Sequence, residues 1–189
     1  MKLIPALLIA FAAFASTAAA QPAPVLQIRS AVGASTYLSG DIGYTAPMTI
    51  VSARIGTGSV ALEPEFAFAR HQAHAVFSLG QEDSRRTFQS VGVNVVRRWR
   101  GRIAPYVGGG VGVFVDHLHT TTVSRDAETF VFDRAGGPTA GVQAFGGADV
   151  RVAGRISILG QGRYELRSLS DLGGGSAWQV MGGVAVDVF

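Results

Sequence analysis

Polar and apolar residues alternate with a period of two along much of this chain. Between residues 155 and 167 nearly every odd position is polar, whereas the even positions carry isoleucine, glycine, tyrosine or leucine. The same alternation recurs over residues 62–69, 90–95 and 142–152. A period of two places the two sets on opposite faces of a β-strand, and none of these segments has the 3.6-residue period of an amphipathic helix. The pattern therefore predicts strands with one polar and one apolar face.

Eight such segments can be counted, and the connections between them alternate in length. Strands are expected at residues 25–38, 48–56, 59–71, 87–98, 102–118, 139–152, 154–168 and 176–189. Short turns are expected at 56–58, 99–101 and 153–154, and longer polar loops at 39–47, 72–86, 120–138 and 169–175. Short turns at one end and long loops at the other are typical of transmembrane barrels.

The N-terminal residues have the features of a secretory signal peptide. Lys2 supplies a positive charge, residues 3–14 are almost entirely apolar, and Ala18-Ala19-Ala20 forms a small-residue cleavage site. A membrane anchor is the alternative, but the apolar run is short for a span of roughly 20 residues. We therefore expect cleavage between Ala20 and Gln21, which leaves residues 1–20 as a signal peptide and residues 21–189 as one barrel domain.

An exported chain of this kind can cross a membrane only as helices or as a closed barrel, because unpaired peptide groups are too costly in hydrocarbon. The longest uncharged stretch of the mature chain, residues 172–186, is shorter than a spanning helix requires and contains five glycines. The expected fold is therefore all-β, an eight-stranded antiparallel up-and-down transmembrane barrel of the bacterial outer membrane.

Composition narrows the possible functions. The chain has no cysteine, which excludes both a lipid-attachment cysteine and a disulfide framework. Lys2 is its only lysine, so the mature chain carries slightly more arginines than acidic residues, and those arginines are spread along the sequence. Nucleic-acid binding normally needs clustered basic residues on one face, so a nucleic-acid partner is not expected.

Several motifs are similar to a known family. The segment Arg102-Ile103-Ala104-Pro105-Tyr106-Val107-Gly108-Gly109-Gly110-Val111-Gly112 resembles the Pro-Tyr-x-Gly-x-Gly-x-Gly strand of small OmpA/OmpX-like outer-membrane barrels. Residues 146–151, followed by Arg163-Tyr164, resemble that family's sixth and seventh strands, and Phe189 resembles its terminal insertion signal. The resemblance implies a monomer in contact with outer-membrane lipid and lipopolysaccharide, which uses periplasmic chaperones and the insertion machinery during biogenesis.

Two residues depart from the family pattern. Asp187 occupies an alternate position counted back from Phe189 that is usually apolar, which implies a bulge near Phe189 or an atypical insertion signal. Pro64 lies inside an expected strand, where its missing N–H would interrupt a ladder of hydrogen bonds. We expect a bulge at Pro64 or a later start to that strand.

The polar face of the strands predicts a plugged barrel, because it carries equal numbers of basic and acidic residues and an unpaired buried charge is costly. The expected interior residues are Arg29, Arg54, Glu63, Glu65, Asp116, Asp149, Arg151, Arg155, Arg163, Glu165, Arg167 and Asp187. Arg29 and Asp187 are expected to join the first and last strands, and Arg54 and Glu63 to pair across the first turn. The opposite face, with Val91, Val93, Val95, Ile156 and Ile158, is expected to meet lipid.

Arginines near both ends could meet lipid phosphates. Arg97, Arg98, Arg100 and Arg102 surround Trp99 near the second short turn, which favours anchoring at the membrane surface over docking of a periplasmic partner. At the other end, Arg70, Arg85 and Arg86 are possible lipopolysaccharide contacts, because a guanidinium group matches a phosphate.

Motifs for other chemistry are weak. Glycines 108–112 lack the spacing of a phosphate-binding loop. His117 and His119 share one strand face, but Asp116 points to the other, so no metal site is predicted. His117, His119, Ser124, Asp126 and Glu128 could supply a catalytic triad only if the fold brought them together. No cofactor or catalytic residue is therefore assigned.

The sequence as a whole favours a structural or interaction protein of the outer membrane that acts through its external loops and is not an enzyme. The alternatives are a narrow channel or carrier for small or apolar solutes, an outer-membrane lipid-modifying enzyme, and a soluble lipocalin-like barrel with a polar exterior.

Overall fold

The computed structural model of the 189-residue chain describes residues 24–39, 42–77, 80–124, 128–167 and 175–188. The expected signal peptide, its cleavage site and Phe189 lie outside these residues. Within the described ranges, no helix is long and apolar enough to cross a membrane.

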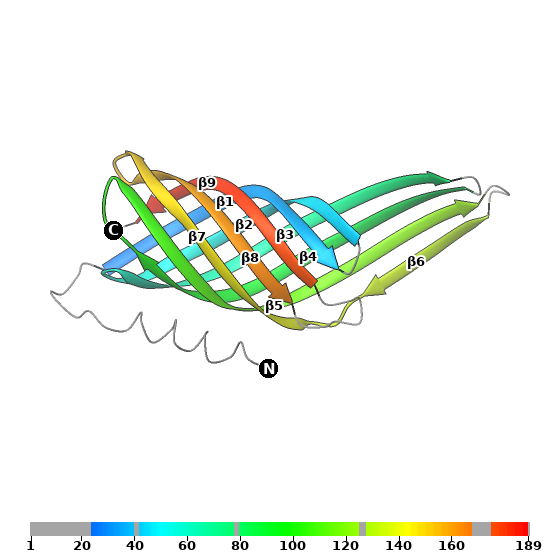
Figure 1. Ribbon diagram of the computed structural model, residues 1–189, viewed down its shortest axis with the longest axis horizontal. Coiled ribbons are helices and arrows are strands. Elements are labelled where there is room, and N and C mark those ends of the chain that lie inside the picture. The colour runs from blue at the N-terminus through cyan, green and yellow to red at the C-terminus, as the bar shows by residue number, and fades with distance from the viewer. Residues whose placement is uncertain (1–23, 40–41, 78–79, 125–127, 168–174, 189) are drawn as a thin grey trace.

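Nine strands, all paired antiparallel, make up the described chain. They are β1 (Pro24–Ser39), β2 (Ile42–Thr57), β3 (Val60–Phe77), β4 (Gly80–Arg98), β5 (Ile103–Ser124), β6 (Thr129–Ala135), β7 (Thr139–Ala153), β8 (Ile156–Arg167) and β9 (Gly175–Asp187). β1 pairs with β9, and β4 pairs with β5, so the eight strands other than β6 close into a barrel (Figure 1). The expected eight-stranded fold is confirmed.

The two faces of the barrel wall differ as the alternation predicts. In β4, the outward Val91 and Val93 are 63% and 49% exposed, whereas the inward Asn94 is fully buried. Ile156 and Ile158 also face outward, and Val95 is half-buried. The exterior is apolar and the interior holds most of the buried polar groups. This is the reverse of a soluble lipocalin-like barrel, so that alternative is wrong.

Much of the sequence expected to form long loops is β-structure. β3 continues to Phe77 and β4 begins at Gly80, so nearly all of the expected loop 72–86 is strand. The expected loop 120–138 contains the end of β5 and all of β6, and β2 begins at Ile42 within the expected loop 39–47. These segments pair as strands although they lack the strict alternation of polar and apolar residues seen in the barrel wall. Most of the expected loop 169–175 lies outside the described residues.

These extensions form a sheet of four strands, β3 to β6, that projects beyond one rim of the barrel (Figure 1). β2 leaves β3 at the pair Met48–Ala69, and β7 leaves β5 at the pair Phe114–Thr139. Beyond those points β3, β4, β5 and β6 pair only with one another in the described chain. We call residues 70–77, 80–87, 117–124 and 129–135 the protruding sheet. The opposite rim carries the three short turns and the end of β9.

Pro64 is accommodated without a bulge, contrary to expectation. The pairs Ser52–Glu65 and Ile55–Leu62 keep one register, so the β2–β3 ladder has a two-residue gap and no shift. Proline has no N–H to donate, which accounts for a local gap. Asp187 also lies in regular register, with its side chain 15% exposed, so β9 has no bulge between Gly175 and Asp187.

Candidate functional site: the filled lumen and the protruding sheet

Charged side chains from five strands meet inside the barrel near the short turns. Arg54 of β2 and Glu63 of β3, expected to pair across the first turn, lie with Nη2 and Oε2 2.7 Å apart. Both side chains are at most 2% exposed. The Ser52 hydroxyl donates a second hydrogen bond to Glu63 at 2.9 Å. The carboxylate is therefore held by two neighbours on the adjacent strand.

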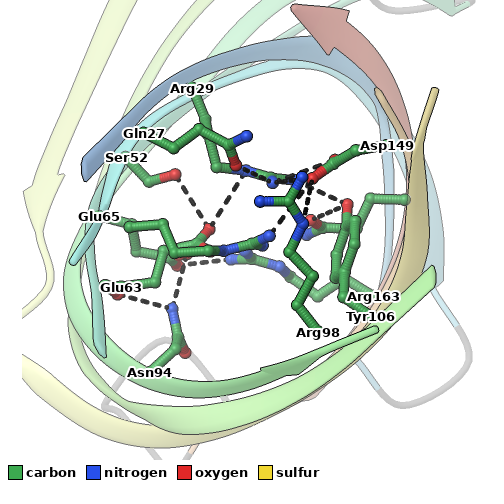
Figure 2. Close-up of polar contacts among 12 residues, drawn as sticks. Gln27, Arg29, Ser52, Glu63, Glu65, Asn94, Arg98, Tyr106, Asp149 and Arg163 are labelled. Carbon is green, nitrogen blue, oxygen red and sulfur yellow. Dashed lines mark hydrogen bonds and ion pairs between the residues drawn. The ribbon is translucent and has the colours of Figure 1, made fainter. Parts of the chain in front are cut away.

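Asp149 of β7 is the acidic centre of this network (Figure 2). Its Oδ2 atom lies 3.0 Å from Arg29 Nη1, 3.4 Å from Arg54 Nη1 and 3.7 Å from Arg98 Nε. Tyr106 packs against the same group, because the guanidinium carbons of Arg29 and Arg54 lie 4.7 and 4.5 Å from its ring centroid. A cation over an aromatic face is electrostatically favourable. The Asp149 carboxylate thus contacts three arginines, and two of them also pack on the Tyr106 ring.

A second network surrounds Glu65. Arg163 Nη2 donates to Glu65 Oε2 at 2.7 Å, and the side-chain amides of Asn94 and Gln143 each donate to the same carboxylate at 2.8 Å. All four side chains are buried. Glu165 continues the network, since its Oε1 atom lies 4.0 Å from Arg163 Nη1, and its Oε2 atom accepts a hydrogen bond from Arg167 Nη2 at 2.8 Å. These ion pairs and hydrogen bonds offset the cost of burying the charges, although Arg163 Nε and Glu165 Oε1 form no hydrogen bond within the described chain.

The lumen is filled at the level of these networks. A cavity beside Arg29, Ser52 and Glu63 measures about 10 Å³, roughly the space of one water molecule. Further toward the protruding sheet, apolar side chains that include Met48, Ala69 and Phe88 form the interior. Neither layer resembles a water-filled channel.

Two expected interior residues lie elsewhere. Arg151 is 52% exposed at the rim, and Arg155 is exposed, because both flank the β7–β8 turn. The expected contact between Arg29 and Asp187 is also wrong. Asp187 instead pairs with Gln27 of β1, whose Nε2 donates at 2.8 Å, and with Arg151 at 3.0 Å. Arg29 is two residues farther from the rim and reaches Asp149.

Sequence analysis missed two interior arginines. Arg86 and Arg98 occupy even positions of β4, as the inward Asn94 does. This shared position in the alternation could have predicted that both arginines face the lumen. Arg86 is 16% exposed and forms an ion pair with Asp116 of β5. Its expected contact with lipopolysaccharide is therefore wrong, because the side chain points inward. Arg85 is exposed on the outward face of β4, and Arg70 is half-buried on the outward face of β3.

His117 and His119 contact Asp133, and sequence analysis did not predict this contact. His117 Nε2 and His119 Nδ1 lie 2.9 and 3.5 Å from the oxygens of Asp133 on β6. In the part of the chain that the structure describes, no group of three histidine or acidic side chains is arranged to hold a metal ion. Ser124 accepts a hydrogen bond from the amide of Glu128 at 3.3 Å, and Asp126 lies outside the described residues.

β6 is the most exposed strand. All seven of its residues are exposed, and Phe130, Val131 and Phe132 are 59%, 63% and 53% exposed. Among the described residues, β6 pairs only with β5, so its other edge is open. The amides of Ser124 and Gly136 donate to the carbonyls of Glu128 and Asp116. Since hydrogen-bonded pairs alternate along an antiparallel ladder, even residues of β6 face β5, and Thr129, Val131, Asp133 and Ala135 face the open edge.

Comparison with known proteins identifies the fold. No protein-family model matches the chain, and no curated protein matches it in sequence. The structure is similar to Neisserial surface protein A (TM-score 0.65, 11% identity), over 85% of this chain and 96% of that one. It is also similar to a major outer-membrane protein of Thermus thermophilus (TM-score 0.60, 11% identity; 87% and 99%). A third similar structure is the attachment invasion locus protein Ail of Yersinia pestis, in complex with sucrose octasulfate (TM-score 0.55, 14% identity; 86% and 98%). The resemblance to small eight-stranded outer-membrane barrels is thus confirmed for the fold.

Proposed function

We propose that the protein is a binding protein of the outer membrane, anchored by its barrel and active through its protruding sheet. The observation that carries this proposal is the open edge of β6, which presents exposed apolar side chains on both faces. We infer that the partner is an extended protein segment rich in β-branched and aromatic residues, which adds to β6 as a further strand.

The chemistry of an edge strand supports this mode of binding. Unpaired backbone amides and carbonyls form a template for another strand, and main-chain hydrogen bonds then supply affinity while side-chain pockets supply specificity. The register places Phe130 and Phe132 beside Thr122 and Thr120 on one face of the sheet, and Val131 beside Thr121 on the other. An added strand could therefore bury apolar surface on both faces.

The barrel supports binding over transport. The charged networks and the apolar layer fill the lumen, which disfavours a channel or carrier. Outward valines and isoleucines cover the wall, as an anchor in hydrocarbon requires. One of the similar structures is an attachment invasion locus protein, and a binding role for the present chain agrees with that name.

Substitution of a single edge amide tests the proposal. Val131→Pro removes one donor that faces the open edge but leaves the β5–β6 hydrogen bonds intact, whereas Val131→Thr keeps the donor and serves as the matched control. Random ten-residue peptides selected for binding to the wild-type protein should lose affinity about tenfold on the proline variant, equivalent to roughly one hydrogen bond. They should bind the threonine variant almost unchanged.

Peptides that bind both variants equally well would contradict strand addition at β6. Selection of peptides that lack alternating β-branched or aromatic residues would also contradict it.

A further inference from the structure

The exposed acidic residues of the described molecule lie at one end only, whereas exposed arginines occur at both ends. The exposed acidic residues Asp83, Glu128 and Asp133 lie on or beside the protruding sheet. At the rim with the short turns, the exposed charged residues are arginines alone: Arg100, Arg102, Arg151 and Arg155, joined by the half-buried Arg97. We call these five residues the arginine sector.

The arginine sector is continuous and lies on one side of the rim. The amide of Arg151 donates to the carbonyl of Arg102 at 2.9 Å, so the β4–β5 and β7–β8 turns are adjacent. The β2–β3 turn, residues 57–59, contains no charged residue. The concentration of arginine is therefore a property of one part of the rim.

Most of the sector is available to an external anion. Arg151 pairs with Asp187 at 3.0 Å, and Arg155 Nη1 donates to the carbonyl of Val188 at 2.8 Å. Among the described residues, no carboxylate forms an ion pair with Arg97, Arg100 or Arg102. The Arg97 guanidinium lies 5.4 Å from the centroid of the Trp99 ring.

The apolar side chains beside the sector place it at a membrane surface. Trp99 is 44% exposed, and the outward Ile103 and Val152 at the same rim are 63% and 53% exposed. Tryptophan is enriched where a membrane meets water, and long basic side chains extend from that level toward phosphates. A guanidinium group can bind a phosphate through two parallel hydrogen bonds.

We propose that the arginine sector binds the phosphate groups of anionic phospholipids in the membrane leaflet at this end of the barrel. A soluble acidic partner fits less well, because the arginines adjoin an outward tryptophan and an aliphatic wall that belongs in lipid. This inference rests on the membrane location proposed above.

The chain contains two tryptophans, which makes a direct test possible. Trp99 lies in the sector, and Trp178 lies near the start of β9, toward the other rim, and is 58% exposed. In Trp178→Phe protein purified from membranes and placed in phosphatidylcholine vesicles, Trp99 is the single reporter. A small fraction of brominated phosphatidylglycerol should quench Trp99 about threefold more than the same fraction of brominated phosphatidylcholine, because several arginines attract the anionic headgroup. In the Trp99→Phe protein, the two lipids should quench Trp178 equally.

Changes to the arginines complete the test. Arg100→Gln, Arg102→Gln and Arg155→Gln together should abolish the preference, whereas Arg85→Gln, an exposed arginine on the protruding sheet, should leave it unchanged. Equal quenching of Trp99 by both lipids would overturn the inference, and so would a preference that survives the triple substitution or is seen equally at Trp178. If purified peptidoglycan retains the wild-type protein but not the triple variant, while both lipids quench Trp99 equally, a periplasmic polymer is the partner and the inference is wrong. Absence of quenching at both tryptophans would instead refute the membrane location.

Discussion

Asp149 of β7 and Arg29 of β1 belong to strands separated by β8 and β9 in the sheet, yet their side chains meet inside the barrel at 3.0 Å. The contact crosses the lumen, so it ties together strands that share no backbone hydrogen bond in the described chain. Arg54 and Arg98 reach the same carboxylate from two further strands.

Asp149→Asn should destabilise the barrel by about 3–5 kcal/mol, because three arginines lose a shared counter-charge and Glu63 alone then faces both Arg29 and Arg54. Asp187→Asn removes an ion pair with the half-exposed Arg151 at the rim and should cost about 1 kcal/mol or less. Urea titrations of both variants in lipid vesicles measure the difference. Equal midpoints would show that the Asp149 network contributes little to stability.

Reversal of the charges in the Arg54–Glu63 pair should recover part of the stability that either single substitution loses. Arg54→Glu or Glu63→Arg alone places two like charges in a fully buried contact, whereas the double variant restores opposite charges at the same positions. A double-mutant cycle should give a coupling of about 1–3 kcal/mol. Additive losses would mean that the two side chains do not depend on each other.

Val93→Arg should cost about 2–4 kcal/mol if the middle of β4 lies in hydrocarbon. Val76→Arg is the matched control, because Val76 is 75% exposed on the protruding sheet and an arginine there stays in water. Arginine at the neighbouring position 94 would be a poor control, because Asn94 is fully buried in the lumen. Refolding into vesicles should fail or weaken for Val93→Arg alone, and similar losses for both variants would contradict the assigned membrane level.

Gly147→Ala should destabilise the barrel by about 1–3 kcal/mol through overpacking. A Cβ at residue 147 would lie 2.7 Å from the Tyr106 hydroxyl and even closer to the backbone carbonyl of Gly160. Gly162→Ala is the control, since a Cβ there has no atom within 4 Å. Thermal unfolding followed by gel mobility should give a lower unfolding temperature for Gly147→Ala than for Gly162→Ala. Equal unfolding temperatures would show that the space beside Tyr106 accommodates a methyl group.

The folded monomer should show no steady conductance in a planar bilayer. Eight-stranded barrels leave little room beyond their own side chains, and here charged and apolar layers occupy the interior. A stable, reproducible channel would reject the filled lumen and restore the transport alternative.

The alternation of polar and apolar residues was sufficient to predict the eight barrel strands and the faces of their central residues, because both faces of a membrane barrel impose a strict chemical choice. It was insufficient beyond the rim. Residues 120–124 are almost all polar, and the alternation of residues 72–75 is lost at Val76 and Phe77. Their pairing therefore follows from continuation of a neighbouring strand, which no local pattern reveals. Parity placed Glu63, Glu65 and Arg163 on the inner face, but it could not show that Arg29 reaches Asp149 in place of Asp187. The Arg29–Asp149 contact depends on how far each residue lies along the barrel axis, because only side chains at the same height in the lumen can meet.

β5 runs without interruption from the short turn at Ile103 to the tip of the protruding sheet at Ser124, and it pairs with β4 along nearly its whole length. A pull on a partner attached to β6, directed along the strands, would therefore load many of these hydrogen bonds at once in shear, instead of opening them one after another. The same backbone continues into the barrel wall, where β5 pairs with β4 on one side and β7 on the other. Such an attachment would be mechanically strong even where the bound partner is held by only a few residues.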